Sequence, residues 1–276
     1  MALDFSSPFT ERTRSVVHAV KLHKAATRKK TQRFLVEGEN SVDAAIATGA
    51  ATDMFLTESA ASKYEHLVTA AGHMGVYIHP ITQKAAETLT DTVTTPGIFA
   101  VCTSVLWPLE RALGRAPKLV CVAVETREPG NAGTLIRVAD AMGADAVVFA
   151  GHTVDPLGAK VVRASAGSLF HIPVAKEPSI DHALTTLRKR GLQILAAAAD
   201  GEVGVDTAPE VLRQPTAWLF GNEAHGLGDE LMGTSDHRVR IPIRGRAESL
   251  NLATAVSICL YESAKAQYSS NDGGPL

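Results

Sequence analysis

Blocks of apolar and polar residues alternate along the second half of the chain in a pattern that predicts strands separated by helices. Four short runs are almost purely apolar, at residues 119–124, 146–150, 192–197 and 216–220. Strands of this kind are typical of a parallel sheet that is covered on both faces. Amphipathic segments at 132–142 and 180–190 predict helices between them, and a glycine ends each one. With a long helix expected over 250–266, the pattern predicts a doubly wound α/β domain.

The first half of the chain repeats this alternation on a smaller scale. Short strands are predicted at residues 34–36, 54–56, 76–78 and 98–104, with helices over 42–47 and 62–72. Two prolines and a glycine in one short segment, 107–117, are typical of a linker. We therefore predict a smaller N-terminal α/β domain with a basic leading segment (1–106), the linker (107–117), the larger domain (118–268) and a disordered tail (269–276).

The composition is that of an ordinary globular protein. Of 276 residues, 45% are hydrophobic and 20% are charged, which is enough apolar material for two domain cores. The three cysteines are widely spaced in apolar surroundings, and no Cys or His spacing matches a metal site, so we predict buried reduced thiols and no metal. Because no apolar run could span a bilayer and the first residues lack a signal-peptide core, we expect a cytoplasmic protein with no membrane partner.

The charge is distributed unevenly. The formal net charge is only −2, yet residues 12–36 contain eight Lys and Arg residues and no Asp or Glu. An acid-free basic stretch is typical of a surface that binds phosphates. A solvated helix face near the terminus would have the same composition, and this stretch alone favours neither interpretation. The residues within it that would contact the phosphates of a nucleic acid are Arg28, Lys29, Lys30 and Arg33.

Polar segments follow the predicted strands, at the edge of a parallel sheet where ligands bind. The first segment leads from the strand at 119–124 into the next helix, for which Asn131 is the predicted cap. Arg137 lies on this helix outside its apolar stripe. Because a cation near a helix N-terminus is unfavourable, Arg137 should have an anionic partner. Considered one at a time, Asn131 is explained by helix capping and Arg137 by a surface ion pair, without a function for either.

Two further polar segments have different compositions. GNEAHGLG, residues 221–228, has three glycines that let the backbone approach a ligand closely, but its spacing matches neither the dinucleotide fingerprint nor a P-loop. RIPIRGRAESLN, residues 240–251, makes Ser249 the predicted cap of the last helix. Its arginines Arg244 and Arg246 suit phosphate contacts. Solvated loops would explain each segment on its own.

Together and in this order, the three segments resemble the SpoU (TrmH-like) family of the SPOUT methyltransferase superfamily. The matching motifs are NAGTLIR from Asn131 to Arg137, LFGNEAHGL over 219–227, and IPIRGRAESLNLATAVSICLYE over 241–262. Three separated motifs with the expected spacing rarely coincide, and the match covers about residues 118–266. In the first half, FLVEGENSVDAAIATG is similar to the L30e-like substrate-binding extension of these enzymes.

The resemblance implies a fold and an activity. The larger domain would be a parallel-sheet SPOUT fold with a deep trefoil knot, and the smaller one an L30e-like RNA-binding domain. Two copies would form a homodimer with active sites at the interface. The implied reaction is S-adenosyl-L-methionine-dependent methylation of an RNA ribose 2′-hydroxyl. The separate N-terminal module favours 23S ribosomal RNA, with a tRNA methyltransferase or a non-catalytic RNA-binding paralogue as alternatives. A Rossmann-type nucleotide enzyme is disfavoured because its glycine fingerprint is missing.

The resemblance also implies roles for individual residues. The expected cofactor-binding residues are Ala197, Ala198, Gly221, Asn222, Ile241, Ser249 and Leu250. The expected catalytic residues are Arg137, Asn131, Glu223, Ser249 and Asn251. Since a guanidinium stays protonated in proteins, we expect Arg137 to hold the ribose-phosphate and stabilise a developing alkoxide rather than act as the base. The proton acceptor stays open between Glu223 and a water molecule.

Overall fold

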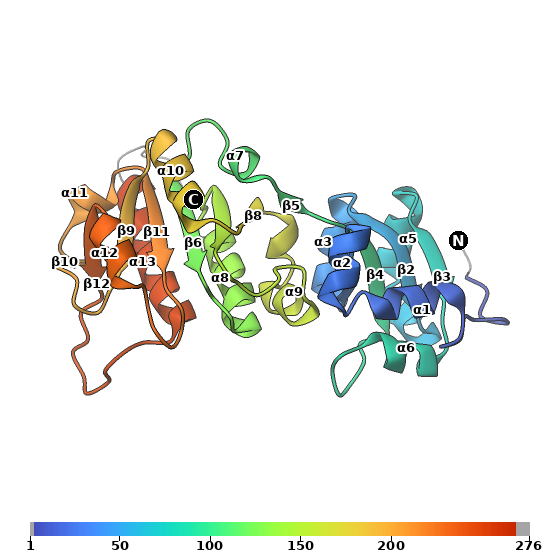
Figure 1. Cartoon of the computed structure of the whole chain (residues 1–276). Coiled ribbons are helices and arrows are strands. Elements are labelled where there is room, and N and C mark those ends of the chain that lie inside the picture. Colours follow the sequence, from blue (N-terminus) through green and yellow to red (C-terminus); the bar gives the residue numbers. More distant parts are fainter. Residues whose placement is uncertain (1–2, 269–276) are drawn as a thin grey trace. The chain divides into compact units, whose positions relative to one another are not determined.

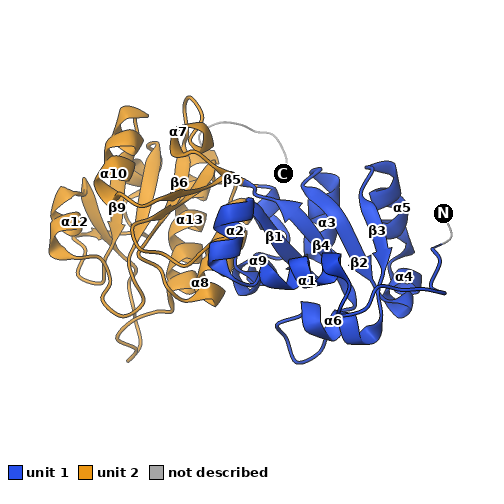
Figure 2. Cartoon of the chain, turned by 45° about the vertical axis from the view of Figure 1, so that its right-hand side comes forward, with its two compact units in different colours: residues 1–105, 157–171 blue, residues 106–156, 172–276 orange. Residues whose placement is uncertain are grey.

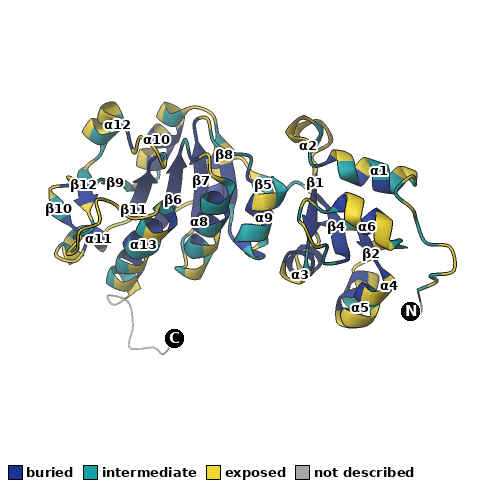
Figure 3. Ribbon diagram, turned by 90° about the horizontal axis from the view of Figure 1, so that it is seen from below, coloured by how far each residue is buried: buried dark blue, intermediate teal, exposed yellow. Residues whose placement is uncertain are grey.

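A computed structural model shows two compact units, and it describes residues 3–268 (Figures 1 and 2). Unit 1 comprises residues 1–105 and 157–171, and unit 2 comprises residues 106–156 and 172–276. The predicted disordered tail, 269–276, lies outside the described residues. Within residues 3–268, no helix has both the length and the apolar character needed to cross a membrane. Each unit has its own sheet and its own buried core (Figure 3).

Unit 1 is built on a four-stranded sheet in the order β1-β4-β2-β3. Its strands are β1 (Arg33–Glu37), β2 (Ala51–Leu56), β3 (Tyr77–Pro80) and β4 (Ile98–Thr103). β4 runs antiparallel to both of its neighbours, whereas β2 and β3 are parallel. The register of β2 against β4 shifts between Ala51 and Asp53, which marks a β-bulge. The structure confirms a smaller N-terminal α/β domain.

The helices of unit 1 bury apolar residues against this sheet. They are α1 (Arg14–Lys21), α2 (Ala25–Thr31), α3 (Glu39–Ala47), α4 (Glu58–Lys63), α5 (Glu65–His73), α6 (Gln83–Leu89) and α9 (Ala159–Ser165). One core cluster joins Val16 of α1 and Leu89 of α6 to Phe55 and Phe99 on the sheet. The basic stretch contains two short helices, α1 and α2, and α1 is anchored by its apolar residues.

Residues 157–171 were expected in the larger domain, but the structure places them in unit 1. Arg163 of α9 donates a hydrogen bond to Glu37 Oε1 at 2.7 Å and also pairs with Asp91. Phe170, in the 3₁₀ turn Ser168–Phe170, stacks on Phe34 with ring centroids 5.9 Å apart. These contacts join positions more than 70 residues apart, and local periodicity carries no information about such pairings.

Unit 2 contains an eight-stranded sheet in the order β10-β12-β9-β11-β6-β7-β8-β5, in which every pair is parallel. The strands are β5 (Leu106–Trp107), β6 (Leu119–Val124), β7 (Ala146–Ala150), β8 (Val174–Glu177), β9 (Gln193–Ala197), β10 (Val203–Gly204), β11 (Thr216–Phe220) and β12 (His237–Arg240). The four predicted apolar runs are β6, β7, β9 and β11, so the parallel α/β prediction is confirmed. β6, β7 and β11 are buried along their whole length because helices cover both faces.

The helices described in unit 2 are α7 (Leu109–Ala112), α8 (Pro129–Ala141), α10 (Ile180–Lys189), α11 (Pro209–Leu212), α12 (Asp229–Thr234) and α13 (Leu252–Tyr268). α8 and α13 pack on each other and on one sheet face, with α10 on the other face (Figure 3). α7 and α10 contribute to the same core cluster. Trp218 of β11 is fully buried, and its Nε1 donates to Ser263 Oγ of α13 at 2.8 Å. That bond ties the last helix to the middle of the sheet.

Segment 107–117, predicted as a linker, is integrated into unit 2. Its first residue, Trp107, belongs to the edge strand β5, which pairs with β8, and α7 follows directly. Leu109, Ala112 and Leu113 are buried in the unit 2 core. Pro108 is the residue that caps the start of α7, and Gly114, with a φ of 62°, follows the end of that helix.

Candidate active site

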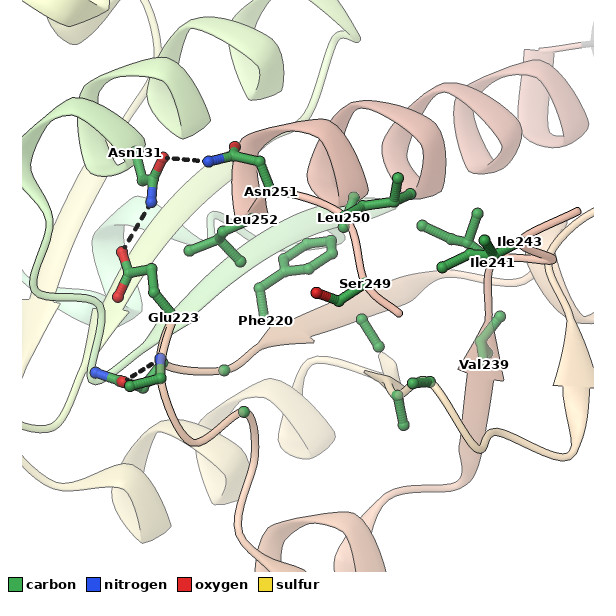
Figure 4. A pocket seen from close by; sticks show the side chains of 18 residues that line it. Asn131, Phe220, Glu223, Val239, Ile241, Ile243, Ser249, Leu250, Asn251 and Leu252 are labelled. Atoms are coloured by element: carbon green, nitrogen blue, oxygen red, sulfur yellow. Dashed lines mark hydrogen bonds between the residues drawn. The ribbon is translucent and has the colours of Figure 1, made fainter. Parts of the chain in front are cut away.

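The principal pocket of unit 2 opens at the carboxyl ends of β9, β11 and β12 (Figure 4). Its volume is about 610 Å³. All seven residues expected to bind the cofactor line it: Ala197, Ala198, Gly221, Asn222, Ile241, Ser249 and Leu250. Asn131, Glu223 and Asn251 line it too. The three polar segments therefore meet at one site, as the ends of adjacent parallel strands must.

Three polar side chains of the pocket are linked by hydrogen bonds. Asn131 donates through Nδ2 to Glu223 Oε1 at 3.2 Å, and Asn251 donates through Nδ2 to Asn131 Oδ1 at 3.3 Å (Figure 4). Each member comes from a different polar segment. Glu223 also accepts from the backbone N–H groups of Arg127 at 3.4 Å and Glu128 at 3.3 Å. We call these three residues the Asn131–Glu223–Asn251 network, and it fixes the loops relative to one another.

The predicted helix caps shift by a few residues. α8 begins at Pro129, and the side chain of Glu128 accepts from the N–H of Gly130, so Asn131 lies inside the first turn and is not the cap. α13 begins at Leu252, and Asn251 Oδ1 accepts from the N–H of Ala253 at 2.8 Å, which is the bond predicted for Ser249. Both shifts leave an amide side chain directed into the pocket.

The glycine-rich loop after β11 is held closed by its backbone. Asn222 and Gly226 exchange two backbone hydrogen bonds, of 3.0 and 2.8 Å. The side chain of Asn222 adds two more hydrogen bonds. Its Nδ2 donates to the carbonyl of Glu125 at 2.9 Å, and its Oδ1 accepts from the N–H of Ala224 at 2.8 Å. A Cβ placed on Gly221 would lie 2.1 Å from the carbonyl carbon of Gly226. Only glycine fits at 221, because the loop folds back against it.

The opposite wall of the pocket is apolar. Every second residue of the extended segment 239–243 contributes an aliphatic side chain to this wall, namely Val239, Ile241 and Ile243, and Leu250 lies beside them (Figure 4). Ile243 is 38% exposed and Leu250 is 37% exposed, so both leave apolar surface open to the cavity that they line. Glu223 is the one ionisable residue that lines the pocket within residues 3–268. Such a surface suits a ligand that is part aromatic and part cationic, and it offers no cation to a phosphate.

Arg137 does not line the pocket. It is exposed on α8, and among residues 3–268 it forms no ion pair. The expected anionic partner is thus not found in this part of the chain. The argument for one was wrong, because α8 begins at Pro129 and Arg137 is its ninth residue. At that distance from the N-terminus the helix dipole no longer disfavours a cation.

The candidate RNA-binding residues divide into one buried and several exposed side chains. Arg28 is only 7% exposed, and its Nη1 donates to the carbonyls of Leu22 and His23, both at 2.8 Å. These bonds fasten the end of α1, so the proposal that Arg28 contacts phosphate was wrong. Exposed candidates are Lys29, Lys30, Arg33, Arg244 and Arg246. Arg244 lies 3.6 Å from Asp206 and is 85% exposed.

Several pocket residues were not predicted from the sequence. Phe220, Val239 and Ile243 all line the cavity. The alternation of apolar residues at 239, 241 and 243 was a usable signal, because period two places all three on the same side of an extended segment. No group of three or more His, Cys, Asp or Glu side chains placed to hold a metal occurs in the described chain.

Comparisons with known proteins match both units. A model of the SpoU rRNA Methylase family matches residues 118–261, which contain all three polar segments. A model described as the MRM3-like substrate binding domain matches residues 14–100. The 23S rRNA (guanosine(2553)-2′-O)-methyltransferase RlmP of Bacillus subtilis (strain 168) is 32% identical over 241 residues, which is 87% of this chain and 92% of that protein.

Two crystal structures with bound AdoMet have the same fold. An rRNA methyltransferase from Sinorhizobium meliloti has a TM-score of 0.81 and 29% identity, and the match covers 92% of this chain and 95% of that one. The SpoU methyltransferase AviRb from Streptomyces viridochromogenes has a TM-score of 0.82 and 26% identity, with coverages of 93% and 100%. The likeness extends across both units.

Proposed function

The chain belongs to the SpoU rRNA methylase family, and from this we propose that it transfers a methyl group from S-adenosyl-L-methionine to a ribose 2′-hydroxyl of ribosomal RNA. The observation that carries the proposal is the pocket of unit 2, where three loops meet and where no Lys, Arg or His among residues 3–268 lines the wall. The relative RlmP is named for 23S rRNA, and this favours 23S rRNA over transfer RNA as the substrate. We expect the reaction to take place in the cytoplasm.

The pocket fits the cofactor in size and in charge. The cofactor supplies an activated methyl group on a positively charged sulfonium. Glu223 adds negative charge to a wall that otherwise consists of apolar side chains, amides and backbone. Backbone groups of Gly221, Ile241 and Leu250 would hold the adenine and ribose. Ala197 and Ala198 would line the adenosine side, and Asn222 and Ser249 would complete the pocket.

The chain's own contribution to the reaction is to place the ribose hydroxyl and help remove its proton. Asn131, itself held by Asn251, keeps Glu223 fixed at the pocket. The backbone N–H of Arg127 donates to one carboxylate oxygen of Glu223, and that of Glu128 donates to the other. Glu223 or a water molecule held by it would accept the proton. Arg137 would fix the ribose-phosphate and stabilise the charge that develops on the hydroxyl oxygen.

A homodimer would supply what one copy lacks. Arg137 is exposed on α8 outside the pocket of its own chain, so a partner copy is the means by which a guanidinium could reach that pocket. The proposal therefore includes an active site at a subunit interface. The family also implies a trefoil knot around the segment 241–251, which we adopt as part of the proposal.

The experiment uses the full chain with methyl-labelled S-adenosyl-L-methionine and either ribosomal or transfer RNA, and maps the 2′-O-methylated positions. Arg137→Ala should lower transfer by about 100-fold or more, since it removes charge stabilisation at the reacting oxygen. Its cofactor affinity should stay within about two-fold of the unmodified chain by calorimetry. Arg115→Ala, another exposed arginine of unit 2, is the matched control and should transfer normally.

Other outcomes would redirect the proposal. Unchanged transfer by Arg137→Ala would contradict the role of this residue. Labelling of transfer RNA alone would identify the substrate as tRNA. A chain that binds RNA but no cofactor would be a non-catalytic RNA-binding paralogue.

A further inference from the structure

A second cavity, of about 710 Å³, lies within unit 1, and none of the active-site residues lines it. It is enclosed by the helices α1 and α2 and by the strands β1, β2 and β4. We call it the unit-1 cavity. Its volume is in the range that holds a small organic ligand or a single nucleotide.

Basic side chains from three different elements border this cavity. Lys21 comes from α1, Lys30 from α2 and Arg33 from β1, and all three are exposed at its edge. His18 of α1 lines it as well. A solvated helix face would carry its charges along one helix, whereas these charges surround a single concave site. Such an arrangement concentrates positive potential where a phosphate group could enter.

One carboxylate stands among these cations. Asp53 of β2 is the single acid that lines the cavity within the described chain. Its Oδ1 lies 3.0 Å from Nε2 of His79, and its Oδ2 accepts from the hydroxyl of Thr52 at 2.8 Å. The hydrogen bond with His79 is the main cause that holds the pKa of Asp53 below its usual value. The carboxylate is therefore ionised at neutral pH.

The local structure holds this carboxylate in one orientation. The ring of His79 lies 5.1 Å from that of Phe9 and 4.9 Å from that of Phe55, between ring centroids. The β-bulge of β2 falls between Ala51 and Asp53, immediately before the carboxylate. Bulges of this kind often redirect a side chain at a functional site. Two independent features thus fix Asp53 at the cavity.

The chemistry of the lining selects a class of ligand. Leu22, Phe55 and Val101 form the apolar floor of the cavity, and each is at most 6% exposed. The cations suit phosphates, but a fixed carboxylate repels a phosphate and accepts N–H donors. Among the four RNA bases, only guanine presents two adjacent N–H groups, N1–H and N2–H, on its Watson–Crick edge. A carboxylate can accept both.

We propose that the unit-1 cavity binds an unpaired guanosine nucleotide of the RNA substrate, with Asp53 recognising the base and Lys21, Lys30 and Arg33 holding the adjoining phosphates. This inference rests on the proposed function in taking RNA as the substrate. It adds a recognition site that is distinct from the pocket where the methyl group is transferred.

The test measures binding of fluorescein-labelled RNA pentamers to the full chain without cofactor. The pentamers have uridines at four positions and G, A, C or U in the centre. The unmodified chain should bind the G pentamer about ten-fold more tightly than the others, as expected for one bidentate contact. Asp53→Asn should bring all four affinities within about two-fold of each other. Lys30→Ala combined with Arg33→Ala should weaken all four similarly, by about ten-fold.

Matched controls separate the cavity from the basic stretch around it. Lys24→Ala removes an exposed lysine that directly precedes α2 and does not line the cavity, and Asp43→Asn removes an exposed acid of unit 1. Both should bind like the unmodified chain. All variants should keep the same melting temperature, within about 2 °C, and the same cofactor affinity, since a folding defect would alter both.

Three results would overturn the inference. They are equal affinity for the four pentamers, an equal loss in Lys24→Ala and in the Lys30→Ala, Arg33→Ala double variant, or an octa-aspartate peptide that displaces the G pentamer as effectively as unlabelled RNA does. The last result would identify an acidic protein segment as the occupant. A chain that prefers guanosine but transfers no methyl group would contradict the proposed function instead. Methyl transfer without any guanosine preference would contradict only the unit-1 cavity.

Discussion

The two cavities of this chain are similar in size but opposite in electrostatic character. The unit 2 pocket has a volume of about 610 Å³ and the unit-1 cavity about 710 Å³. Among the described residues, no Lys, Arg or His lines the first, whereas four basic residues line the second. A formal net charge of −2 conceals this difference completely. The chain separates a site suited to a compact cationic cofactor from one suited to a polyanion.

The linings of the unit 2 pocket and of the unit-1 cavity are also built differently. The unit 2 pocket depends on close backbone packing, as at Gly221, where a Cβ would meet backbone atoms at 2.1 Å. The unit-1 cavity presents side chains from helices and strands, with Asp53 held by His79. We therefore expect backbone substitutions to disable the first site and charge substitutions to disable the second.

The largest effect is expected from Gly221→Ala. The added Cβ has no room against Gly226, so the loop must move and the cofactor wall with it. A displacement of this kind should weaken cofactor binding by about 100-fold or more, measured by calorimetry. Gly228→Ala is the control, because a Cβ there meets no atom within 4 Å and should change the affinity by less than about two-fold. Equal losses in both variants would contradict a specific packing role for Gly221.

The salt dependence of ligand binding should distinguish the two sites, with an effect smaller than that of Gly221→Ala. If about three phosphates are held by basic side chains, RNA affinity should fall by about 20-fold between about 50 and about 200 mM salt. Cofactor affinity should change by less than about two-fold, because its pocket is lined by no basic side chain in the described part of the chain. Fluorescence anisotropy for RNA and calorimetry for cofactor provide the two slopes. If RNA affinity and cofactor affinity depended equally on salt concentration, the proposed difference in charge between the two sites would be contradicted.

The smallest effect concerns the stability of unit 1 in acid. The hydrogen bond with His79 lowers the pKa of Asp53 from its ordinary value of 3.8. A lowered folded-state pKa means that the stabilisation is present above about pH 4 and is lost as the pH falls through the folded value. Because this pair is partly exposed, Asp53→Asn should cost less than about 1 kcal/mol at pH 7. Urea unfolding should show that cost shrinking at about pH 3, and a constant difference would contradict the ionic origin.

The sequence pattern predicted the four central strands of the unit 2 sheet because these strands are covered on both faces. β6, β7, β9 and β11 appear as continuous apolar runs for that reason. The strands β5 and β10, at the two edges, have two residues each and exist through pairing with a neighbour, which no local pattern can reveal. The same limit applies to α9, whose partners lie in unit 1.

The candidate site could be located from the sequence only as a set. Asn131, Glu223 and Asn251 are each ordinary loop or helix-end residues, and their link appears when the three segments come together. Arg28 shows the opposite case. Its position in a basic stretch suggested a phosphate contact, but its guanidinium is used by the carbonyls of Leu22 and His23. Charge patterns identify a surface, not which of its side chains are free to bind.

The assignment of residues 157–171 to unit 1 has a topological consequence. The chain passes from one unit to the other three times, at 105–106, 156–157 and 171–172, instead of once. No single cut or gene fusion point can therefore yield both units intact. A fragment that begins at 118 would keep the whole methylase match but would carry α9 without the strand it packs on. Expression of unit 2 alone therefore means removing or replacing residues 157–171, which pack on unit 1.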